Sequence, residues 1–207
     1  MYIPEHFCES RTSVLHDLMR RHSFATLISG GAELTASQLP VLLDAARGPN
    51  GTLRSHMARQ NPQWQTFHEH SDVLVIFQGP HAYISPTWYA SRSRVPTWNY
   101  ATVHAYGRPR LVDHPTLHSI LEETVNTYES AFPSPWSLSK LPHELISKLE
   151  DAVVGFEIEI TRLEGKRKLN QNHPAQDRQG AIAGLESRGD PASLDIAALM
   201  REMDKDP

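Results

Sequence analysis

The feature that most constrains the fold is an alternation of apolar and polar residues in VGFEIEITRLEG, residues 154–165, which is regular from Phe156 to Thr161. Phe156, Ile158 and Ile160 would share one face of a strand, with polar side chains such as Glu157 on the other face. A period of two is typical of a β-strand with one buried face. The chain is therefore expected to contain a sheet that covers a core on one side.

Further short segments are rich in strand-forming residues and are separated by glycine, proline or Asn-Gly turn signals. The predicted strands are residues 24–30, 33–44, 51–57, 72–79 and 100–112. Together with the alternating segment, these strands are sufficient to close a small antiparallel barrel.

Helical periodicity occurs outside these strands. Residues 10–22 carry apolar side chains at helical spacing behind a serine cap. A second helix is expected between Pro115 and Pro133, and a shorter one at 142–151. The polar, glycine-punctuated tail has a weak helical signal at 193–203.

This pattern predicts an α+β chain that is mainly β. Its 207 residues are enough for one sizeable domain with a hydrophobic core. We expect that domain to span residues 1–173, with the helices inserted at about 114–151, and a helical tail to occupy residues 174–207.

Charge and composition limit the possible partners. The 20 Lys and Arg against 24 Asp and Glu leave a net charge of −4, which gives no bulk attraction for nucleic acid or anionic membrane. The longest apolar run, at 73–77, is far shorter than the roughly 20 residues of a membrane span, and the first residues show no leader pattern, so a cytoplasmic protein is expected. The single cysteine, Cys8, excludes an internal disulfide and a cysteine-based zinc site.

The common catalytic motifs of hydrolases, zincins, P-loop proteins and dinucleotide-binding folds do not occur. The chain has twelve histidines, and the tightest group is His-Glu-His at 68–70. No carboxylate or cysteine at a recognisable spacing completes a ligand set. We expect ordinary hydrogen-bonded histidines and no metal site.

One stretch fits neither a core nor a solvated loop. Residues 83–100, YISPTWYASRSRVPTWNY, place five aromatic rings around Arg92 and Arg94. Such a stretch would suit a partner that is flat, apolar on its faces and anionic at one end. The alternative is that Trp88 and Trp98 are core or interface anchors and the arginines are solvated.

A second candidate segment is LRSHMARQNPQW, residues 53–64, in which a strand runs into a turn. Ser55, His56 and Arg59 could together hold an anion, because hydroxyl donors and a guanidinium fork both address phosphate oxygens. The alternative is a capped turn with a solvated arginine. A third segment, at 35–44, carries small hydroxyls and an amide before its apolar half.

Four blocks of this sequence closely resemble the PaiB family, described as FMN-binding negative transcriptional regulators within the pyridoxamine-phosphate-oxidase-like split-barrel group. The blocks are HMARQNPQW, FQGPHAYISPTWY, VPTWNYATVHAYGRPR and KRKLNQNHP. The resemblance extends from MYIPEHF to KLNQN, which is most of the chain. Two positions depart from the family pattern: Gln38 stands where a histidine is expected, and Asn170 where a serine usually precedes Gln-Asn.

The resemblance implies a split β-barrel with flanking helices, paired as a homodimer with FMN bound at the subunit boundary. It implies that segment 55–61 holds the phosphate and that segments 37–38 and 83–88 border the flavin ring. The implied cofactor contacts are Ser37, Gln38, Ser55, His56, Arg59, Ile84, Ser85, Trp88, Trp98, Asn99, Tyr100, Lys168 and Gln171.

Several alternatives remain open at this point. Lys166, Arg167 and Lys168 either face water or include one cation directed at the flavin edge. The chain is expected to be a PaiB-type regulator. The alternative is an FMN-dependent oxidoreductase with an unidentified substrate, and haem binding is a third hypothesis. No residue stands out as a catalytic acid or base, and direct DNA binding stays undecided.

Overall fold

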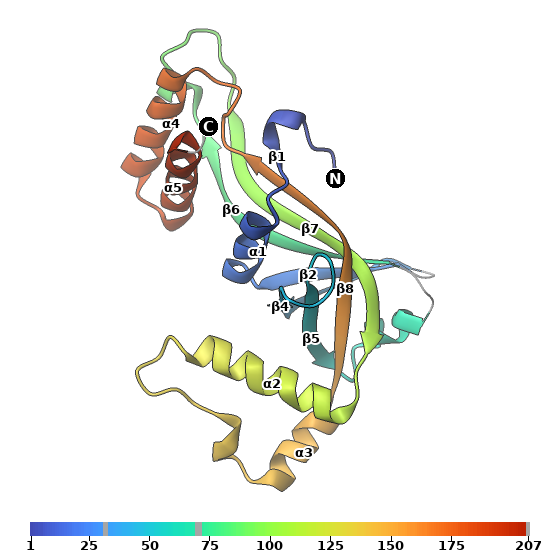
Figure 1. The fold of residues 1–207 in the computed structure, drawn as a ribbon. Coiled ribbons are helices and arrows are strands. Elements are labelled where there is room, and N and C mark those ends of the chain that lie inside the picture. Colours follow the sequence, from blue (N-terminus) through green and yellow to red (C-terminus); the bar gives the residue numbers. More distant parts are fainter. Residues whose placement is uncertain (31–32, 69–71, 206–207) are drawn as a thin grey trace. The chain divides into compact units, whose positions relative to one another are not determined.

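The computed structural model describes residues 1–30, 33–68 and 72–205, and it divides the chain into two compact units. The terminal unit contains Met1–Leu18, Gln78–Val103 and Glu164–Pro207. The barrel unit contains Met19–Phe77 and His104–Leu163. Three long strands, β6, β7 and β8, which are labelled in Figure 1, each contribute residues to both units. The expected division of the chain at residue 173 stays a prediction.

The barrel unit is built on an antiparallel sheet. Its strands lie in the order β3-β2-β6-β7-β8-β5-β4. They are β2 (Phe24–Ser29), β3 (Thr35–Pro40), β4 (Leu42–Asp44), β5 (Thr52–Ala58) and the barrel portions of β6 (Val73–Ile84), β7 (Thr97–Leu111) and β8 (Val153–Lys168). This confirms a mainly β architecture with flanking helices.

The two ends of the strand order are consecutive in the chain. The segment 33–44, expected as one strand, is divided at Val41, whose backbone N–H donates to the carbonyl of Ser23 at 2.8 Å. The Oγ of Ser55 in β5 donates to the carbonyl of Pro40 at the end of β3, at 2.6 Å. The chain therefore turns from one end of the sheet directly into the other, as a barrel requires.

The alternation in β8 positions the core of the barrel unit. Phe156, Ile158 and Ile160 are fully buried, and the ring of Phe67 meets that of Phe156 edge-on at a centroid distance of 5.2 Å. Glu157 lies on the opposite face and is also buried. Its carboxylate accepts two hydrogen bonds from Arg47, at 2.6 and 2.8 Å, and these bonds hold the pKa of Glu157 below its usual value despite burial.

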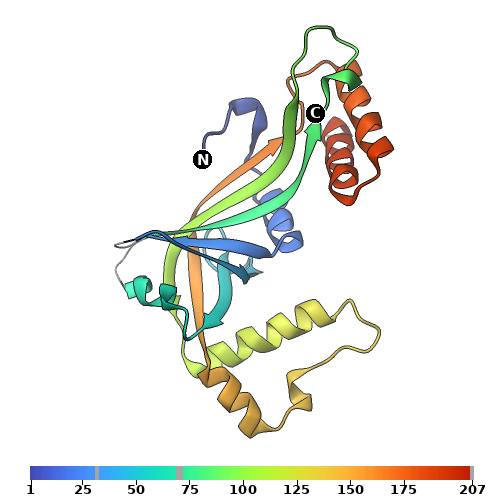
Figure 2. The same ribbon diagram turned by 180° about the vertical axis from the view of Figure 1, so that it is seen from behind.

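The expected helices between β7 and β8 are present. They are α2 (His114–Glu129) and α3 (His143–Asp151), with the short 3-10 turn η4 (Leu138–Lys140) between them (Figure 2). A further 3-10 turn, η2 (Pro62–His68), follows β5. Asp113 begins α2 as its N-cap, because its side chain accepts from the backbone N–H of Thr116 at 3.1 Å. Among the described helices, none has the length and apolarity to cross a membrane.

The terminal unit combines the ends of the three long strands with helices from both chain termini. Its elements are η1 (Glu5–Phe7), β1 (Cys8–Glu9), η3 (Pro86–Trp88), α4 (Ala175–Arg188), α5 (Pro191–Lys205) and most of α1 (Thr12–Arg21), which continues into the barrel unit. β1 pairs with β8, with Cys8 opposite Lys166. α4 and α5 lie side by side over a buried cluster that includes Ile84 and Leu185 (Figure 1).

The expected helical tail contains α4 as well as α5, although only residues 193–203 carried a helical signal. The glycines of α4 explain the difference. A Cβ at Gly184 would overlap the ring of Trp88, and a Cβ at Gly180 would overlap the carbonyl of Trp88. Glycine is therefore required at both positions, one helical turn apart, for Trp88 to pack on α4. These glycines weaken the helical signal that local sequence provides.

Candidate functional site

Five of the predicted cofactor contacts lie in the barrel unit and eight in the terminal unit. Those in the barrel unit are Ser37, Gln38, Ser55, His56 and Arg59. Those in the terminal unit are Ile84, Ser85, Trp88, Trp98, Asn99, Tyr100, Lys168 and Gln171. Each set is described by itself.

In the barrel unit, a direct hydrogen bond joins the segments at 37–38 and 55–61. The side-chain amide of Asn61 donates to Ser37 Oγ at 2.9 Å. Ser37 is half-buried and the next residue, Gln38, is exposed. Because Ser37 Oγ accepts this bond, its own hydrogen is left to donate to an anion. Asn61 was quoted in the sequence pattern but not singled out, and it is the residue that links the two segments.

Ser55 and His56 are neighbours in β5 with different environments. The hydroxyl of Ser55 donates its hydrogen to the carbonyl of Pro40. To donate to a phosphate, Ser55 would have to break this bond, so its contact with phosphate stays a prediction. His56 Nδ1 is buried and has no hydrogen-bond partner among the described residues. Burial lowers the pKa of His56, which keeps its ring neutral at neutral pH. A buried ring nitrogen without a partner indicates a site made for another polar group.

Arg59 is exposed and already has a structural task. Its Nε donates to the carbonyl of Asp151 at 2.6 Å, and Nη2 donates to the carbonyl of Val153 at 2.8 Å. These bonds hold the turn between α3 and β8, and the indole N–H of Trp64 donates to the carbonyl of Arg59 at 3.0 Å. The guanidinium of Arg59 thus anchors this turn and also places a positive charge at the surface of the barrel unit.

In the terminal unit, the described aromatic side chains gather around Trp98, which is 54% exposed. The ring of Tyr83 meets Trp98 edge-on at 6.0 Å, and the ring of His81 lies 6.2 Å away. Lys168 Nζ donates to the carbonyl of Trp98 at 3.0 Å and also to the hydroxyl of Thr97. We call His81, Tyr83, Trp98 and Lys168 the aromatic face.

Electrostatics at the aromatic face favour a negatively charged neighbour. Burial and the adjacent charge of Lys166 lower the pKa of Lys168 from its usual value. Lys166 itself lies 5.3 Å from the ring centre of Tyr100. The cation of Lys168 beside the exposed ring of Trp98 suits a planar ligand that carries negative charge.

Among the other predicted contacts, Ile84 and Asn99 lie in the packed interior of the terminal unit, whereas Ser85 and Trp88 are half-buried. Ile84 and Asn99 are fully buried, and Asn99 Nδ2 donates to Met200 Sδ at 3.4 Å. Trp88 packs on α4, and Ser85 caps η3 by accepting from the backbone N–H of Thr87 at 3.2 Å. These positions favour the core-anchor alternative for Trp88, and their cofactor contacts stay predictions.

A buried carboxylate that the sequence analysis did not single out anchors the loop after Trp88. Asp177 in α4 accepts from the backbone N–H of Ser91 at 2.8 Å and lies 3.3 Å from Arg94 Nε. Burial opposes the charge, but these partners keep the pKa of Asp177 below its usual value. Arg94 is therefore part of a loop anchor. The sequence signal available for Asp177 was its position four residues after His173.

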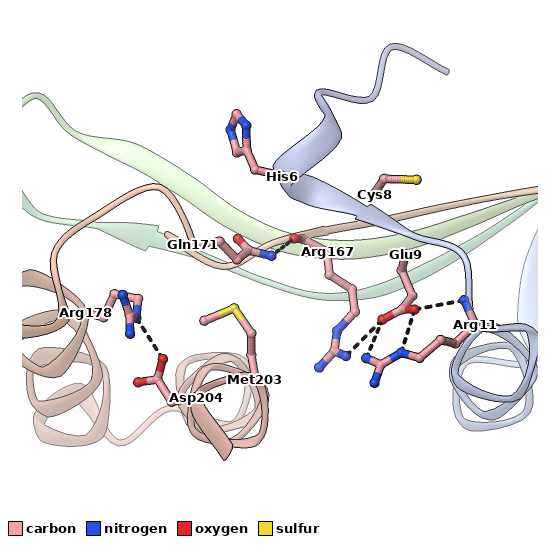
Figure 3. Close-up of a pocket in the computed structure, with 9 residues that line it drawn as sticks. All are labelled: His6, Cys8, Glu9, Arg11, Arg167, Gln171, Arg178, Met203 and Asp204. Atoms are coloured by element: carbon pink, nitrogen blue, oxygen red, sulfur yellow. Dashed lines mark hydrogen bonds and ion pairs between the residues drawn. The ribbon is translucent and has the colours of Figure 1, made fainter. Parts of the chain in front are cut away.

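A cavity of about 470 Å³ opens in the terminal unit and includes Gln171 in its lining (Figure 3). Gln171 Nε2 donates to the carbonyl of Arg167 at 2.5 Å, and its Oε1 accepts from the backbone N–H of Leu169 at 2.7 Å. Gln171 therefore fixes the end of β8 beside the cavity. The cavity is lined by His6, Cys8, Glu9, Arg11, Arg167, Gln171, Arg178, Met203 and Asp204.

The remaining sequence candidate for a metal site cannot be placed. In the group at 68–70, residues 69–70 and the side chain of residue 68 lie outside the described part of the chain. Among the described residues, no group of three or more potential ligands is positioned to hold a metal ion.

Comparison with known proteins decides the family. Residues 1–162 match the family described as "Putative FMN-binding domain". The chain belongs to this FMN-binding family. It is also 34% identical to "Protease synthase and sporulation protein PAI 2" of Bacillus subtilis, with 98% of this chain and 97% of the relative covered. The resemblance to the PaiB family is therefore confirmed, and FMN is the cofactor of the family.

Solved structures with low sequence identity share the fold. The "putative 5-nitroimidazole antibiotic resistance protein" of Bacteroides thetaiotaomicron matches with a TM-score of 0.55 and 11% identity, over 77% of this chain and 85% of that chain. The "FAD and Heme binding protein" of Mycobacterium smegmatis matches with a TM-score of 0.54 and 14% identity, over 84% and 78%. These likenesses confirm the split-barrel fold expected for the FMN-binding family.

Proposed function

We propose that the phosphate of FMN binds to the barrel unit of this protein at the surface formed by β3 and the end of β5. The observation that carries this proposal is the neutral, buried His56 Nδ1 that has no partner among the described residues. Ser37 adds a hydroxyl that is free to donate, and Arg59 adds positive charge. Donors of these kinds suit phosphate oxygens.

The aromatic face of the terminal unit is proposed, on its own chemistry, as a surface for the flavin ring. Trp98 and Tyr83 expose apolar rings, and Lys168 places a cation beside them. When bound, FMN supplies hydride or single-electron transfer. A cation near the ring would favour the negatively charged reduced form and raise the redox potential. Tyr100 is proposed as a supporting contact, whereas the amide of Gln171 already bonds to Arg167 and Leu169 beside the cavity.

We further propose that the protein is a cytoplasmic homodimer that acts as a PaiB-type regulator by an indirect route. The similarity to the Bacillus subtilis protein over nearly the whole of both chains supports a shared role. The net charge of −4 argues against strong direct binding to DNA. A redox-sensed small molecule or a protein partner would then connect the flavin to transcription.

The alternative is an FMN-dependent oxidoreductase acting on a small molecule. Flavin chemistry needs no protein acid or base in principle, so the absence of an evident general acid or base does not oppose this function. Bleaching of the bound flavin by NAD(P)H, followed by reoxidation with a candidate acceptor, would favour the enzyme.

The test of the cofactor is the visible absorption spectrum of the purified protein, before and after addition of FMN. We expect a flavin spectrum and quenching of FMN fluorescence on binding. A haem spectrum would support the hypothesis of haem binding, and a colourless protein that does not take up FMN would overturn the proposal. The regulatory role is tested by gel shift with promoter DNA across a salt series, where direct phosphate contacts would produce a steep salt dependence.

A further inference from the structure

We propose that the cavity shown in Figure 3 binds the carboxylate or phosphate group of a small molecule other than FMN, with Arg167 as the main charge partner. The cavity lies within the terminal unit and measures about 470 Å³. This volume falls in the range of metabolite-sized pockets, roughly 300–1,000 Å³. The site is separate from the phosphate surface proposed on the barrel unit.

The first argument is that Arg167 is buried but weakly compensated. Its side chain is about nine-tenths buried, and its two ion pairs, to Glu9 and Glu202, are both 3.4 Å long. Charge-assisted hydrogen bonds of good geometry measure about 2.7–2.9 Å. A buried guanidinium needs close anionic partners, because removing its charge from water is costly. Arg167 therefore has capacity for a better partner.

The second argument is that the carboxylate of Glu9 is mainly used by another arginine. Arg11 reaches it with three donors: the backbone N–H and Nε at 3.0 Å to Oε1, and Nη2 at 2.8 Å to Oε2. Figure 3 shows Glu9 between Arg11 and Arg167. One carboxylate is thus shared by two guanidinium groups, and Arg11 makes the shorter bonds.

The third argument concerns the acidic residues at the end of α5. Glu202 pairs with Arg167 at 3.4 Å, and Asp204 accepts from Arg178 Nε at 2.8 Å. Both acids lie in the last turn of α5, where the helix dipole disfavours negative charge. Glu202 is also 63% exposed. An anionic ligand could therefore replace Glu202 at Arg167 at little cost.

The lining determines the chemical class of the ligand. Guanidinium groups match the planar and tetrahedral oxygens of carboxylates and phosphates by forked hydrogen bonds. Arg178 approaches from α4, where its Nη1 donates to the carbonyl of His173 at 2.8 Å. Met203 and Cys8 supply less polar lining. A small organic acid or phosphate ester fits this combination.

The experiment is isothermal titration calorimetry of the purified protein with inorganic phosphate and, separately, citrate, at constant ionic strength and with glycerol as the neutral control. Each titration is run with and without saturating FMN. With saturating FMN, which occupies the phosphate surface proposed on the barrel unit, we expect at least one anion to bind with one site per chain. Without FMN we expect the same site and, for phosphate, a second site on the barrel unit. The anion that binds more tightly identifies phosphate or carboxylate as the preferred group.

Variants with opposite expected signs make the test specific. Arg178→Gln or Arg167→Gln should weaken anion binding by about tenfold, whereas Glu202→Gln should tighten it several-fold, because Arg167 loses an internal competitor. Glu186→Gln is the matched control, since this exposed acid pairs with Arg201 and does not line the cavity. If circular dichroism shows that Arg167→Gln does not fold, the effects of Arg178→Gln and Glu202→Gln on anion binding test the proposal.

Three results would overturn the proposal. The first is that neither anion binds. The second is that Glu202→Gln and Arg178→Gln leave the dissociation constant of the anion unchanged. The third is that saturating FMN abolishes anion binding, which would assign the cavity to the cofactor. Failure of the protein to bind FMN would overturn only the proposed function, because the anion titration has its own readout.

Discussion

At the scale of single residues, the candidate sites depend on polar groups whose partners are incomplete. His56 and Arg167 are the two main cases. His56 is neutral, and its Nδ1 has no partner among the described residues. Arg167 is a buried cation with long ion pairs. Arg59 differs, because its guanidinium already anchors a turn. Predictions for these residues therefore separate binding from stability.

Arg59→Ala should weaken FMN binding by about tenfold, because it removes one charged partner of the phosphate. It should also reduce stability by about 1 kcal/mol, because two hydrogen bonds to backbone carbonyls are lost. Fluorescence titration of FMN and urea unfolding measure the two effects. Arg108→Ala is the control, since this exposed residue pairs with Asp72. Unchanged FMN affinity would remove Arg59 from the site.

Glu9 should make the free energy of unfolding depend on pH in the acidic range. Burial raises the pKa of this carboxyl, but hydrogen bonds from Arg11 and Arg167 outweigh it and lower the pKa from 4.5 to about 2. A depressed pKa in the folded state contributes stability that is complete above the unfolded value and is lost as the pH falls from 4.5 toward 2. The difference in unfolding free energy between wild type and Glu9→Gln should therefore shrink across that window.

Urea unfolding of both proteins at a series of pH values measures this difference. Other carboxyls titrate in the same range, but they do so equally in the two proteins and cancel in the comparison. A difference that stays constant from neutral pH down to pH 3, a value inside the window between 4.5 and about 2, would show that Glu9 is not held by the arginines.

At the scale of elements, α4 positions the segment that carries the predicted ring contacts. Gly180 and Gly184 receive Trp88, and Asp177 holds the loop through Ser91 and Arg94. These contacts join a loop and a helix that are distant in the sequence. α4 thus serves as a rigid support for residues 85–94.

Gly184→Ala should destabilise the protein by about 1–3 kcal/mol, because the added methyl group overlaps the ring of Trp88 and overpacks the contact. Tryptophan fluorescence during urea unfolding measures the loss. Gly30→Ala is the control, since nothing lies within 4 Å of a Cβ at that position. Equal stability of the two variants would contradict the packing of Trp88 on α4.

Asp177→Ala should release the loop at 91–94 and expose it to protease. Arg92 and Arg94 are potential tryptic sites, and the variant loses both the bond to Ser91 and the ion pair to Arg94. Limited trypsin digestion followed by mass spectrometry should show faster cleavage after these arginines. Asp195→Ala, at an exposed position of α5, should digest like wild type. Wild-type cleavage rates in Asp177→Ala would indicate that the loop is held by other contacts.

Sequence periodicity predicted the strands of the barrel because alternation is a local property that burial imposes directly. The predicted strand 33–44 is divided at Val41 because the residues before Val41 pair with β2 and those after it pair with β5. The bounds of α4 within the expected helical tail could not be predicted, since its two glycines serve a ring nearly a hundred residues away. The same limit applies to the site: Ser37 could be named from the segment at 35–44, but its link to Asn61 depends on the fold.

At the scale of the whole molecule, the family assignment leads to a prediction about assembly. The resemblance implies a homodimer with one FMN per chain. Light scattering after size-exclusion chromatography should give twice the mass of the chain, and the flavin absorbance should correspond to one FMN per chain. A monomer that binds FMN with full affinity would show that one chain holds every necessary contact.

The three long strands also constrain how the protein is made. The chain passes between its two units four times, and β8 must pair with both β1 and β5. The ribosome releases β8 late in synthesis, so neither unit can complete its pairing while translation of the first 150 residues proceeds. Distant pairing of this kind slows folding and leaves strand edges exposed in the meantime. The nascent chain should therefore depend on chaperones until its last quarter has emerged.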